Sequence, residues 1–365
     1  MTSAVLKHIP FQTCQAYVNE WTASRPKIAL ITAIACTILG IASTGAAVSL
    51  NLIPAATVAL VLSAIVTFCI SIALFVSYAK RSSVDMQLTH EHLTQVMQHT
   101  LADLKKGQYT SPNGQVHALN MQPAIEGTQC VATAGNVGRR PGIFPTRITV
   151  VSQDCLQVAQ DLHVRGLNPC VADFANSTHA GGGYLYGARA QEEHICRCSG
   201  LSVVIDPRHG MQTHNFYPLN ESTPAAGLYV PQVPVFHAGK TFEYLNQPFP
   251  IAVAVLAAPY KPSLQSVSGR LRLNDQDAHL VRERIRTMLE MAFINGHRSV
   301  VLGAFGCGAF ANPPEHIAAI FNDIIQSDYP GCFEEIVFAV LDDHNTGKEH
   351  NPEGNFAPFK RQFPN

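Results

Sequence analysis

Residues 170–199 read CVADFANSTHAGGGYLYGARAQEEHICRCS, and this stretch gives the clearest indication of the fold class. It begins with a short apolar run, Cys170–Phe174, which is typical of a buried strand. A glycine-rich loop follows, and then a helix predicted at 187–199. The same order returns later in the chain, where Ser299–Leu302 leads through a second glycine-rich loop to a helix predicted at 314–327. Two strand–loop–helix units of this kind favour an α/β fold.

The rest of the chain after residue 83 continues the alternation of strands and helices. We predict, in chain order, a helix at 84–106, a strand at Ile148–Val151, a helix at 153–165, a strand at Ile251–Ala257, a helix at about 275–295, a strand at Ile336–Leu341 and a loop at 344–357. This pattern predicts a mixed or mostly parallel central sheet covered by helices. Ligands of such folds bind beyond the carboxyl ends of the strands, where both glycine-rich loops emerge.

The first loop carries candidate catalytic groups. Three consecutive glycines, Gly181–Gly183, expose backbone N–H groups that suit close approach to a phosphate or a ribose. After seven further residues, Gln191-Glu192-Glu193 begins the helix. Adjacent glutamates on a helix point about 100° apart, so they cannot flank one glycosidic bond as in an ordinary glycosidase. We expect one to perform acid/base chemistry and the other to hold ribose hydroxyls. The alternative is a solvated helix face on which Arg189 and Arg197 pair with Glu193.

The second loop suits a diphosphate. Residues 302–314 read LGAFGCGAFANPP, with Gly303, Gly306 and Gly308 spaced for a tight, phosphate-cradling turn before a helix. Phe310 is the large side chain among small neighbours, which favours a ring near a ribose or a base. The alternative is an ordinary strand–helix turn.

Together these motifs resemble the microbial poly(ADP-ribose) glycohydrolase family, a branch of the macrodomain superfamily. The spacing GGG-x7-QEE resembles the catalytic loop of that family, and GAFGCGAFANPP resembles its diphosphate-binding loop. Glu91–Tyr109 is similar to its N-terminal helix, and Val337–Asp342 to its closing strand. The resemblance implies a macrodomain-like three-layer α/β/α domain with a mixed central sheet over residues 83–365.

The resemblance also implies a role for each motif residue. Glu193 would be the catalytic acid/base and Glu192 its ribose-binding neighbour. The substrate-binding residues would be Asn176 at the distal ribose, Gly181, Gly182 and Gly183 near that ribose and the diphosphate, Gln191 beside the glutamates, Gly306, Cys307, Gly308 and Ala309 at the diphosphate, and Phe310 against the distal ribose.

The expected reaction is hydrolysis of the O-glycosidic bond of poly- or mono-ADP-ribose through an oxocarbenium-like transition state. Glu193 would protonate the leaving oxygen and then activate water, which requires a raised pKa. We expect no metal and no cofactor, because His179 and His194 lack a third ligand at suitable spacing. One alternative is a non-catalytic ADP-ribose reader that recruits ADP-ribosylated partners to a membrane. Another is an enzyme that removes mono-ADP-ribose and acts little on chains.

A separate N-terminal segment is predicted to span a membrane. Residues 28–79 contain no Asp, Glu, Lys, Arg or His, enough for two spans, and Asn51 and Pro54 break the run at its centre. We therefore predict a transmembrane helical hairpin after an N-terminal tail at 1–27. Basic residues on both flanks place both termini on the cytosolic side. A signal peptide and a buried core hairpin are the alternatives.

This layout resembles the inclusion-membrane proteins of chlamydiae, which implies a secreted effector in the membrane of a pathogen's vacuole, acting on ADP-ribosylated proteins or poly(ADP-ribose). The composition, 47% hydrophobic and 14% charged, agrees with an added apolar segment. A net charge of −1 argues against duplex nucleic acid as a partner. The ten scattered cysteines are interpreted as reduced thiols.

Overall fold

The computed structural model describes residues 89–132, 138–209, 216–219, 223–239 and 241–364. Within these ranges, no helix combines the length and the apolar character that crossing a membrane requires. The hairpin predicted at 28–79 lies outside the described residues, so it stays a prediction. The compact unit that carries the two glycine-rich loops comprises His90–Asn365.

A seven-stranded sheet organises this unit. The strand order is β3-β6-β7-β5-β10-β11-β4. Strands β7, β5, β10, β11 and β4 are parallel to one another, and β6 is antiparallel to both of its neighbours, β7 and β3. The strands are β3 (Gln129–Val131), β4 (Arg147–Val151), β5 (Pro169–Phe174), β6 (Gly227–Ala238), β7 (Glu243–Leu256), β10 (Ser299–Leu302) and β11 (Glu335–Ala339). The predicted α/β fold with a mixed central sheet is therefore confirmed.

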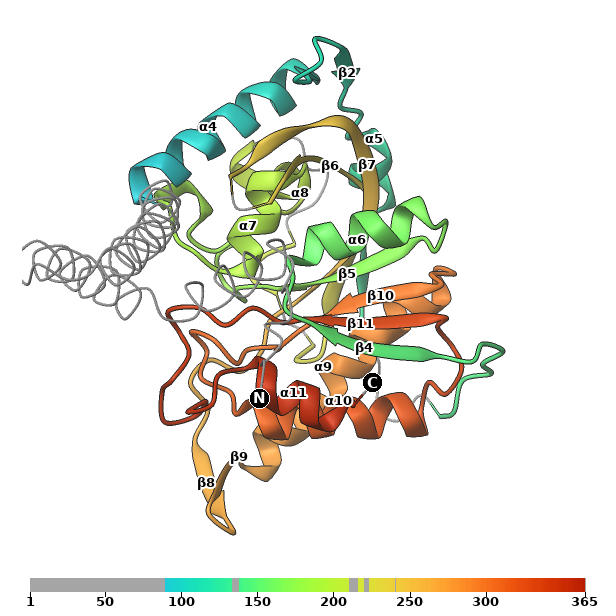
Figure 1. The fold of residues 1–365 in the computed structure, drawn as a ribbon, viewed down its shortest axis with the longest axis vertical. Coiled ribbons are helices and arrows are strands. Elements are labelled where there is room, and N and C mark those ends of the chain that lie inside the picture. Colours follow the sequence, from blue (N-terminus) through green and yellow to red (C-terminus); the bar gives the residue numbers. More distant parts are fainter. Residues whose placement is uncertain (1–88, 133–137, 210–215, 220–222, 240, 365) are drawn as a thin grey trace, which may run out of the picture. The chain divides into compact units, whose positions relative to one another are not determined.

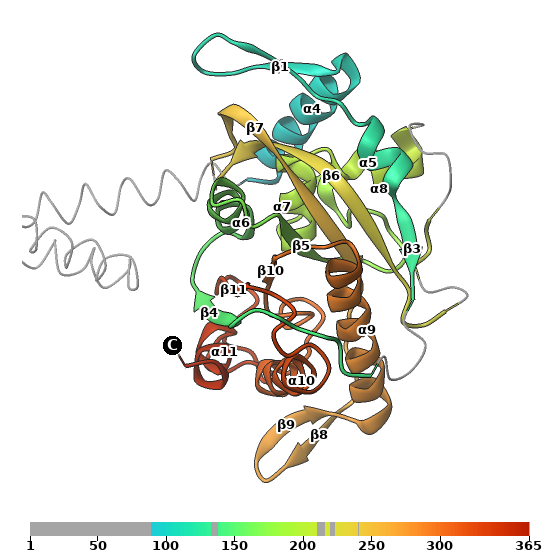
Figure 2. The same ribbon diagram turned by 90° about the vertical axis from the view of Figure 1, so that its right-hand side faces the viewer.

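Helices cover both faces of the sheet. Figures 1 and 2 show α9, α10 and α11 on one side and α4, α6, α7 and α8 on the other. The helices are α4 (His90–Lys106), α5 (Gln122–Gly127), α6 (Cys155–Val164), α7 (Gln191–Cys198), α8 (Leu201–Ile205), α9 (Asp275–Ile294), α10 (Pro314–Ser327) and α11 (Phe356–Gln362), with short 3-10 turns η1 (Tyr184–Tyr186) and η2 (Pro207–His209).

Strand β5 shows how the sequence divides the two layers. Its side chains alternate between the faces of the sheet. Cys170 and Ala172 join the apolar core formed with α9 and α10. Val171 and Asp173 alternate with them along the strand and face the layer of α6 and α7. All four are buried, which is typical of a central parallel strand.

Two small hairpins extend from the unit. In β1 (Gln108–Thr110) and β2 (Val116–Ala118) the strands pair directly after α4. The second hairpin joins β8 (Leu264–Val267) to β9 (Arg270–Leu273) and precedes α9. Its turn residues Ser268 and Gly269 have φ of 52° and 77°, as a tight two-residue turn requires.

The structure corrects several predicted boundaries. The helix predicted at 187–199 begins only at Gln191, because η1 and Gly187 occupy the loop before it. The strand predicted at Ile251–Ala257 is the end of the much longer β7. Part of the loop predicted at 344–357 is the start of α11.

Candidate active site

The two glycine-rich loops leave the same edge of the sheet. Strands β5 and β10 are parallel neighbours, with Val301 opposite Val171, so the segments that follow them emerge side by side. At the base of the loops the ring of Phe174 lies 5.7 Å from that of Phe305. A Cβ added at Gly303 would lie 3.1 Å from Phe174, so the glycine allows the second loop to start there. The predicted meeting of the two loops is therefore confirmed.

Gln191 fixes the catalytic helix to the sheet. Its side-chain oxygen accepts a hydrogen bond from Phe174 N at 2.9 Å, and its nitrogen donates to Ala172 O at 2.5 Å. The amide therefore satisfies the end of β5 as a neighbouring strand would. Gln191 was predicted to bind substrate, whereas its observed contacts orient α7.

The two glutamates of α7 are buried beneath the glycine loop. Glu192 is 3% exposed and Glu193 is 7% exposed. Each carboxylate accepts a backbone hydrogen bond through one oxygen, from Asn176 N to Glu192 Oε2 at 2.8 Å and from Gly183 N to Glu193 Oε1 at 2.9 Å. The other oxygen of each is buried and has no partner among the described residues. Two buried acceptor oxygens are therefore left without a partner under the glycine loop.

The three glycines hold these carboxylates in place. Gly181 N also donates to Glu192, and Gly182 N donates to His179 O at 2.9 Å. A Cβ at Gly182 would lie 2.5 Å from Glu193 Oε1 and 3.0 Å from Glu192 Oε2. The sequence interpretation was that these N–H groups are exposed to ligand, which is wrong. Because glycine has no Cβ, the carboxylates of α7 approach the backbone and accept from Gly181 N and Gly183 N, while Gly182 N bonds to the loop itself.

The solvated, arginine-paired helix face is also wrong. Arg197 is 1% exposed, and it donates from Nε to Leu93 O at 3.3 Å and from Nη2 to Tyr184 O at 3.1 Å. It forms no ion pair with Glu193, although the two lie one helical turn apart. Arg197 instead connects α4 to the glycine loop.

A third acid, Asp173, lies behind the glutamates and was missed in the sequence. It is fully buried on β5, and both of its side-chain oxygens lack partners among the described residues. Burial, and then the charge of Glu193, raise the Asp173 pKa well above its ordinary value. Burial, and then the charges of Asp173 and Glu193, likewise raise the pKa of Glu192. Asp173 and Glu192 therefore retain protons that isolated carboxylates would lose.

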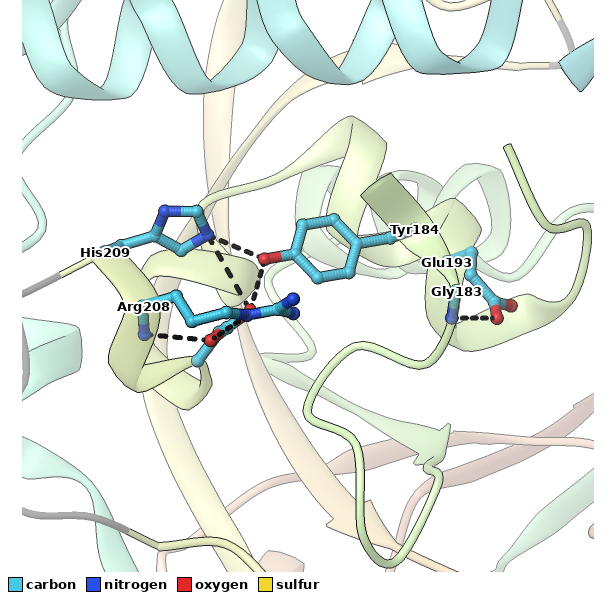
Figure 3. A network of polar contacts seen from close by, with 6 residues as sticks. Gly183, Tyr184, Glu193, Arg208 and His209 are labelled. Atoms are coloured by element: carbon cyan, nitrogen blue, oxygen red, sulfur yellow. Dashed lines mark hydrogen bonds and ion pairs between the residues drawn. The ribbon is translucent and has the colours of Figure 1, made fainter. Parts of the chain in front are cut away.

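A buried tyrosine packs against the glycine loop, and its hydroxyl points away from Gly183 toward His209 (Figure 3). The ring of Tyr184 is fully buried, and a Cβ at Gly181 would lie 2.6 Å from it. Its hydroxyl donates to Asp206 Oδ2 at 2.5 Å and lies 2.6 Å from His209 Nε2. Burial alone would raise the pKa of Asp206, but hydrogen bonds from Arg208 and Tyr184 lower it, so Asp206 stays ionised. This network was not predicted, because nothing in the spacing of its residues brings them together.

Asn176 shapes the entry to the loop. Its Oδ1 accepts hydrogen bonds from Thr178 N at 2.9 Å and His179 N at 3.0 Å, closing a turn after β5. Its Nδ2 has no partner among the described residues, so the predicted contact with a ribose remains open to it.

The second loop is held by a buried asparagine. Asn312 is fully buried and donates through Nδ2 to Pro259 O at 2.8 Å and to Gly306 O at 3.1 Å. Gly306 has φ of 72°, and a Cβ there would lie 2.6 Å from the same amide nitrogen. The loop backbone is therefore fixed before any ligand arrives.

Most, but not all, of the predicted backbone N–H groups of this loop are available to bind a ligand. Gly306, Gly308, Ala309 and Phe310 have no backbone N–H partner among the described residues, which fits a cradle for a diphosphate. Cys307 differs from the prediction, because its N–H donates to Ala304 O at 3.0 Å. The tight turn at Gly306 folds the Cys307 backbone inward.

Phe310 lies half-buried at the rim. Its ring packs against the core of α9 and α10 and meets the exposed ring of Tyr260 edge-to-face, with centroids 5.2 Å apart. The predicted position of an aromatic ring beside the second loop agrees with this placement. Within the described ranges, no group of three or more His, Cys, Asp and Glu side chains is placed to hold a metal. His194, for example, pairs through Nε2 with Asp154 at 2.7 Å.

Comparison with known proteins agrees with this geometry. Residues 97–238 match the family model for the microbial-type PARG catalytic domain. Poly(ADP-ribose) glycohydrolase from Thermomonospora curvata is similar in structure, at 29% identity and a TM-score of 0.62, over 75% of this chain and 100% of that one. The Deinococcus radiodurans enzyme in complex with ADP-ribose is similar at 29% identity and a TM-score of 0.55, over 68% of this chain and 98% of that one. No curated protein sequence matched the chain.

Proposed function

We infer that this chain, a poly(ADP-ribose) glycohydrolase-like enzyme with a microbial-type PARG catalytic domain, hydrolyses the O-glycosidic bond of poly- or mono-ADP-ribose. One observation carries the inference. Glu192 and Glu193 are buried under the glycine loop, each bound through one oxygen to a backbone N–H and each with the second oxygen unfilled. A buried acid with a free oxygen can exchange a proton with a bound substrate.

In the proposed mechanism, Glu193 is the acid/base. Its Oε1 is fixed by Gly183 N, so Oε2 is the oxygen that protonates the leaving group and later takes a proton from water. Asp173 supports this cycle, because its raised pKa keeps a proton and limits the negative charge behind Glu193. The deprotonated glutamate then stabilises the oxocarbenium-like transition state by its charge.

Substrate binding divides between the two loops. The unpartnered N–H groups of Gly308, Ala309 and Phe310 would cradle the diphosphate, and the ring of Phe310 would pack on the distal ribose. The second oxygen of Glu192 and the side-chain nitrogen of Asn176 would contact ribose hydroxyls. The Deinococcus radiodurans relative, whose structure contains ADP-ribose, supports a ligand of this class.

A non-catalytic reader is the second candidate. A reader needs the diphosphate loop but does not need two buried carboxylates, whose desolvation is unfavourable. The hydrolase hypothesis therefore explains the two buried carboxylates, whereas the reader hypothesis does not.

We also propose that the enzyme is attached to a membrane through residues 28–79 and acts on ADP-ribosylated proteins or polymer at the cytosolic face, as a secreted effector at a vacuole membrane. The charge-free run of 52 residues and its basic flanks support the attachment. Sodium carbonate washing of membranes should leave the full chain in the pellet, whereas a chain beginning at Ser83 should be released. Full chain in the carbonate supernatant would contradict the attachment.

The catalytic proposal is tested by Glu193→Gln in the full chain. Glutamine keeps the shape and can still accept from Gly183 N, but it cannot exchange a proton. We expect release of ADP-ribose to fall by about 10²–10⁴-fold or more, while ADP-ribose affinity measured by calorimetry changes only a few-fold. Glu91→Gln, an exposed glutamate of α4, is the matched control and should leave both unchanged. Wild-type turnover by the Glu193→Gln protein would reject Glu193 as the acid and restore the reader.

A further inference from the structure

A polar hollow lies on the surface away from the two glycine-rich loops. Its volume is about 440 Å³, and it is formed where the β8–β9 hairpin meets the first turns of α9 and α10. Figure 2 shows this hairpin at the ends of both helices. The polar side chains that line it are Gln265, Arg272, Asp275, His279, Arg282 and His316. Helix α10 begins directly after the diphosphate loop, so the hollow shares the edge of the sheet on which the proposed active site lies.

His316 presents one defined donor to this hollow. The residue is 8% exposed, and its Nδ1 accepts a hydrogen bond from Leu273 N at 3.1 Å. With Nδ1 occupied as an acceptor, the proton of the neutral ring lies on Nε2. Nε2 has no partner among the described residues. Burial, and then the charges of Arg272 and Arg282, lower the His316 pKa to about 4, so the ring is neutral near pH 7.

Two arginines converge on the same place. Arg272 is exposed and forms no ion pair within the described part of the chain, although the neighbouring Arg270 reaches Glu315 at 3.6 Å. Arg282 lies across the hollow on α9, where its Nη2 contacts Asp323 at 2.9 Å. Asp323 is itself exposed, so it screens Arg282 only partly. The hollow therefore combines an unpaired guanidinium, a second one and a buried N–H donor.

We propose that this hollow binds a phosphate group, with Arg272 and Arg282 as countercharges and His316 Nε2–H as a neutral donor. Arginine forks match phosphate oxygens, and a fixed N–H donor adds direction. If the proposed function holds, the ligand is the diphosphate of an ADP-ribose unit next to the one that is cleaved. The hollow would then favour polymer over a single ADP-ribosyl group.

Arg272→Gln tests the site, with Arg270→Gln as the matched control. Both changes remove one charge from the same strand, but only Arg272 lines the hollow. In the full chain, kept in mild detergent because of its apolar N-terminal segment, KM is measured for poly(ADP-ribose) and for a mono-ADP-ribosylated protein. We expect Arg272→Gln to raise KM for polymer roughly three- to tenfold and to leave KM for the single unit within about twofold. Arg272→Glu should have the larger effect, and Arg270→Gln should resemble wild type.

A direct binding experiment tests the phosphate site without relying on enzyme turnover. Inorganic pyrophosphate is titrated by calorimetry into full-length wild type, Arg272→Gln and Arg270→Gln, each with ADP-ribose present in excess. Weaker binding only in Arg272→Gln supports the phosphate site, even if the chain hydrolyses nothing and the proposed function fails. Pyrophosphate binding with unchanged polymer KM would identify a free phosphate compound as the ligand instead of the polymer. Equal binding by all three proteins would overturn the proposal.

Discussion

Gly182→Ala should slow catalysis by about 10²-fold without unfolding the protein. Gly182 has φ of 60°, and a Cβ there would lie 2.5 Å from Glu193 Oε1. Ordinary van der Waals contact begins at 3.4 Å, so the carboxylate has to retreat by about 0.9 Å. The same Cβ would also press on Glu192 Oε2, at 3.0 Å. The substitution therefore displaces both acids at once.

Two separate magnitudes follow from this geometry. The left-handed backbone costs an alanine about 1–2 kcal/mol, and each kcal/mol lowers Tm by about 2–4 °C in a domain of 150–250 residues. A displacement of about 1 Å at a reacting group costs about 10²-fold in rate. Activity should therefore fall far more than stability.

Gly166→Ala separates the two effects. Gly166 has φ of 72° in the turn between α6 and β5, and nothing lies within 4 Å of its added Cβ. The Tm of the Gly166→Ala variant should fall by about as much as that of Gly182→Ala, and its activity should equal that of the wild type. Thermal unfolding and initial rates of ADP-ribose release from polymer measure both quantities. If Gly182→Ala and Gly166→Ala are equally active, the close contact between the glycine loop and Glu193 is not required for catalysis.

Two further substitutions test other parts of the site. Phe310→Ala should weaken ADP-ribose binding roughly ten- to hundredfold in calorimetry, because it removes the ring beside the second loop; unchanged affinity would mean that the ring only fills the core. Asp173→Asn should remove a pH-dependent loss of stability. Because the Asp173 pKa is raised in the folded protein, the contribution of Asp173 to the free energy of unfolding is complete below about pH 3.9. Above that pH this contribution falls by about 1.4 kcal/mol per pH unit until the pKa of the folded state is reached. The Tm of the variant relative to wild type should therefore rise from pH 5 to pH 8, and parallel curves would contradict it.

The strands β5 and β10 and the helices after them could be predicted because buried parallel strands appear in the sequence as short apolar runs. Cys170–Phe174 and Ser299–Leu302 are short apolar runs between turn signals, and both are central parallel strands. The long antiparallel pair of β6 and β7 was largely missed. Prolines and polar residues interrupt its sequence, and register shifts between Val230 and Val233 show that bulges accommodate them.

The site divides in a similar way. The spacing of the glycines and glutamates predicted a glycine-rich loop followed by a helix that carries the acids, and the structure has this order. The spacing could not predict which groups take the glycine N–H groups, since that depends on how closely α7 approaches the loop. Asp173 was missed for a related reason. An acid within an apolar strand has no local signal that separates a buried proton carrier from a polar strand end.

The Gln191-Glu192-Glu193 motif combines a structural residue with two residues that carry the proposed chemistry. By bonding to Phe174 N and Ala172 O, the side-chain amide of Gln191 extends the sheet, while the two glutamates after it carry the proposed chemistry. A glutamate in its place would present a second acceptor to the Ala172 carbonyl and lose that attachment. Among divergent relatives, a chain that keeps both acids but replaces this glutamine would retain the reactive groups without the means of aiming them. Survival of the glutamine is thus a criterion for sorting active from inactive copies that the two acids alone do not supply.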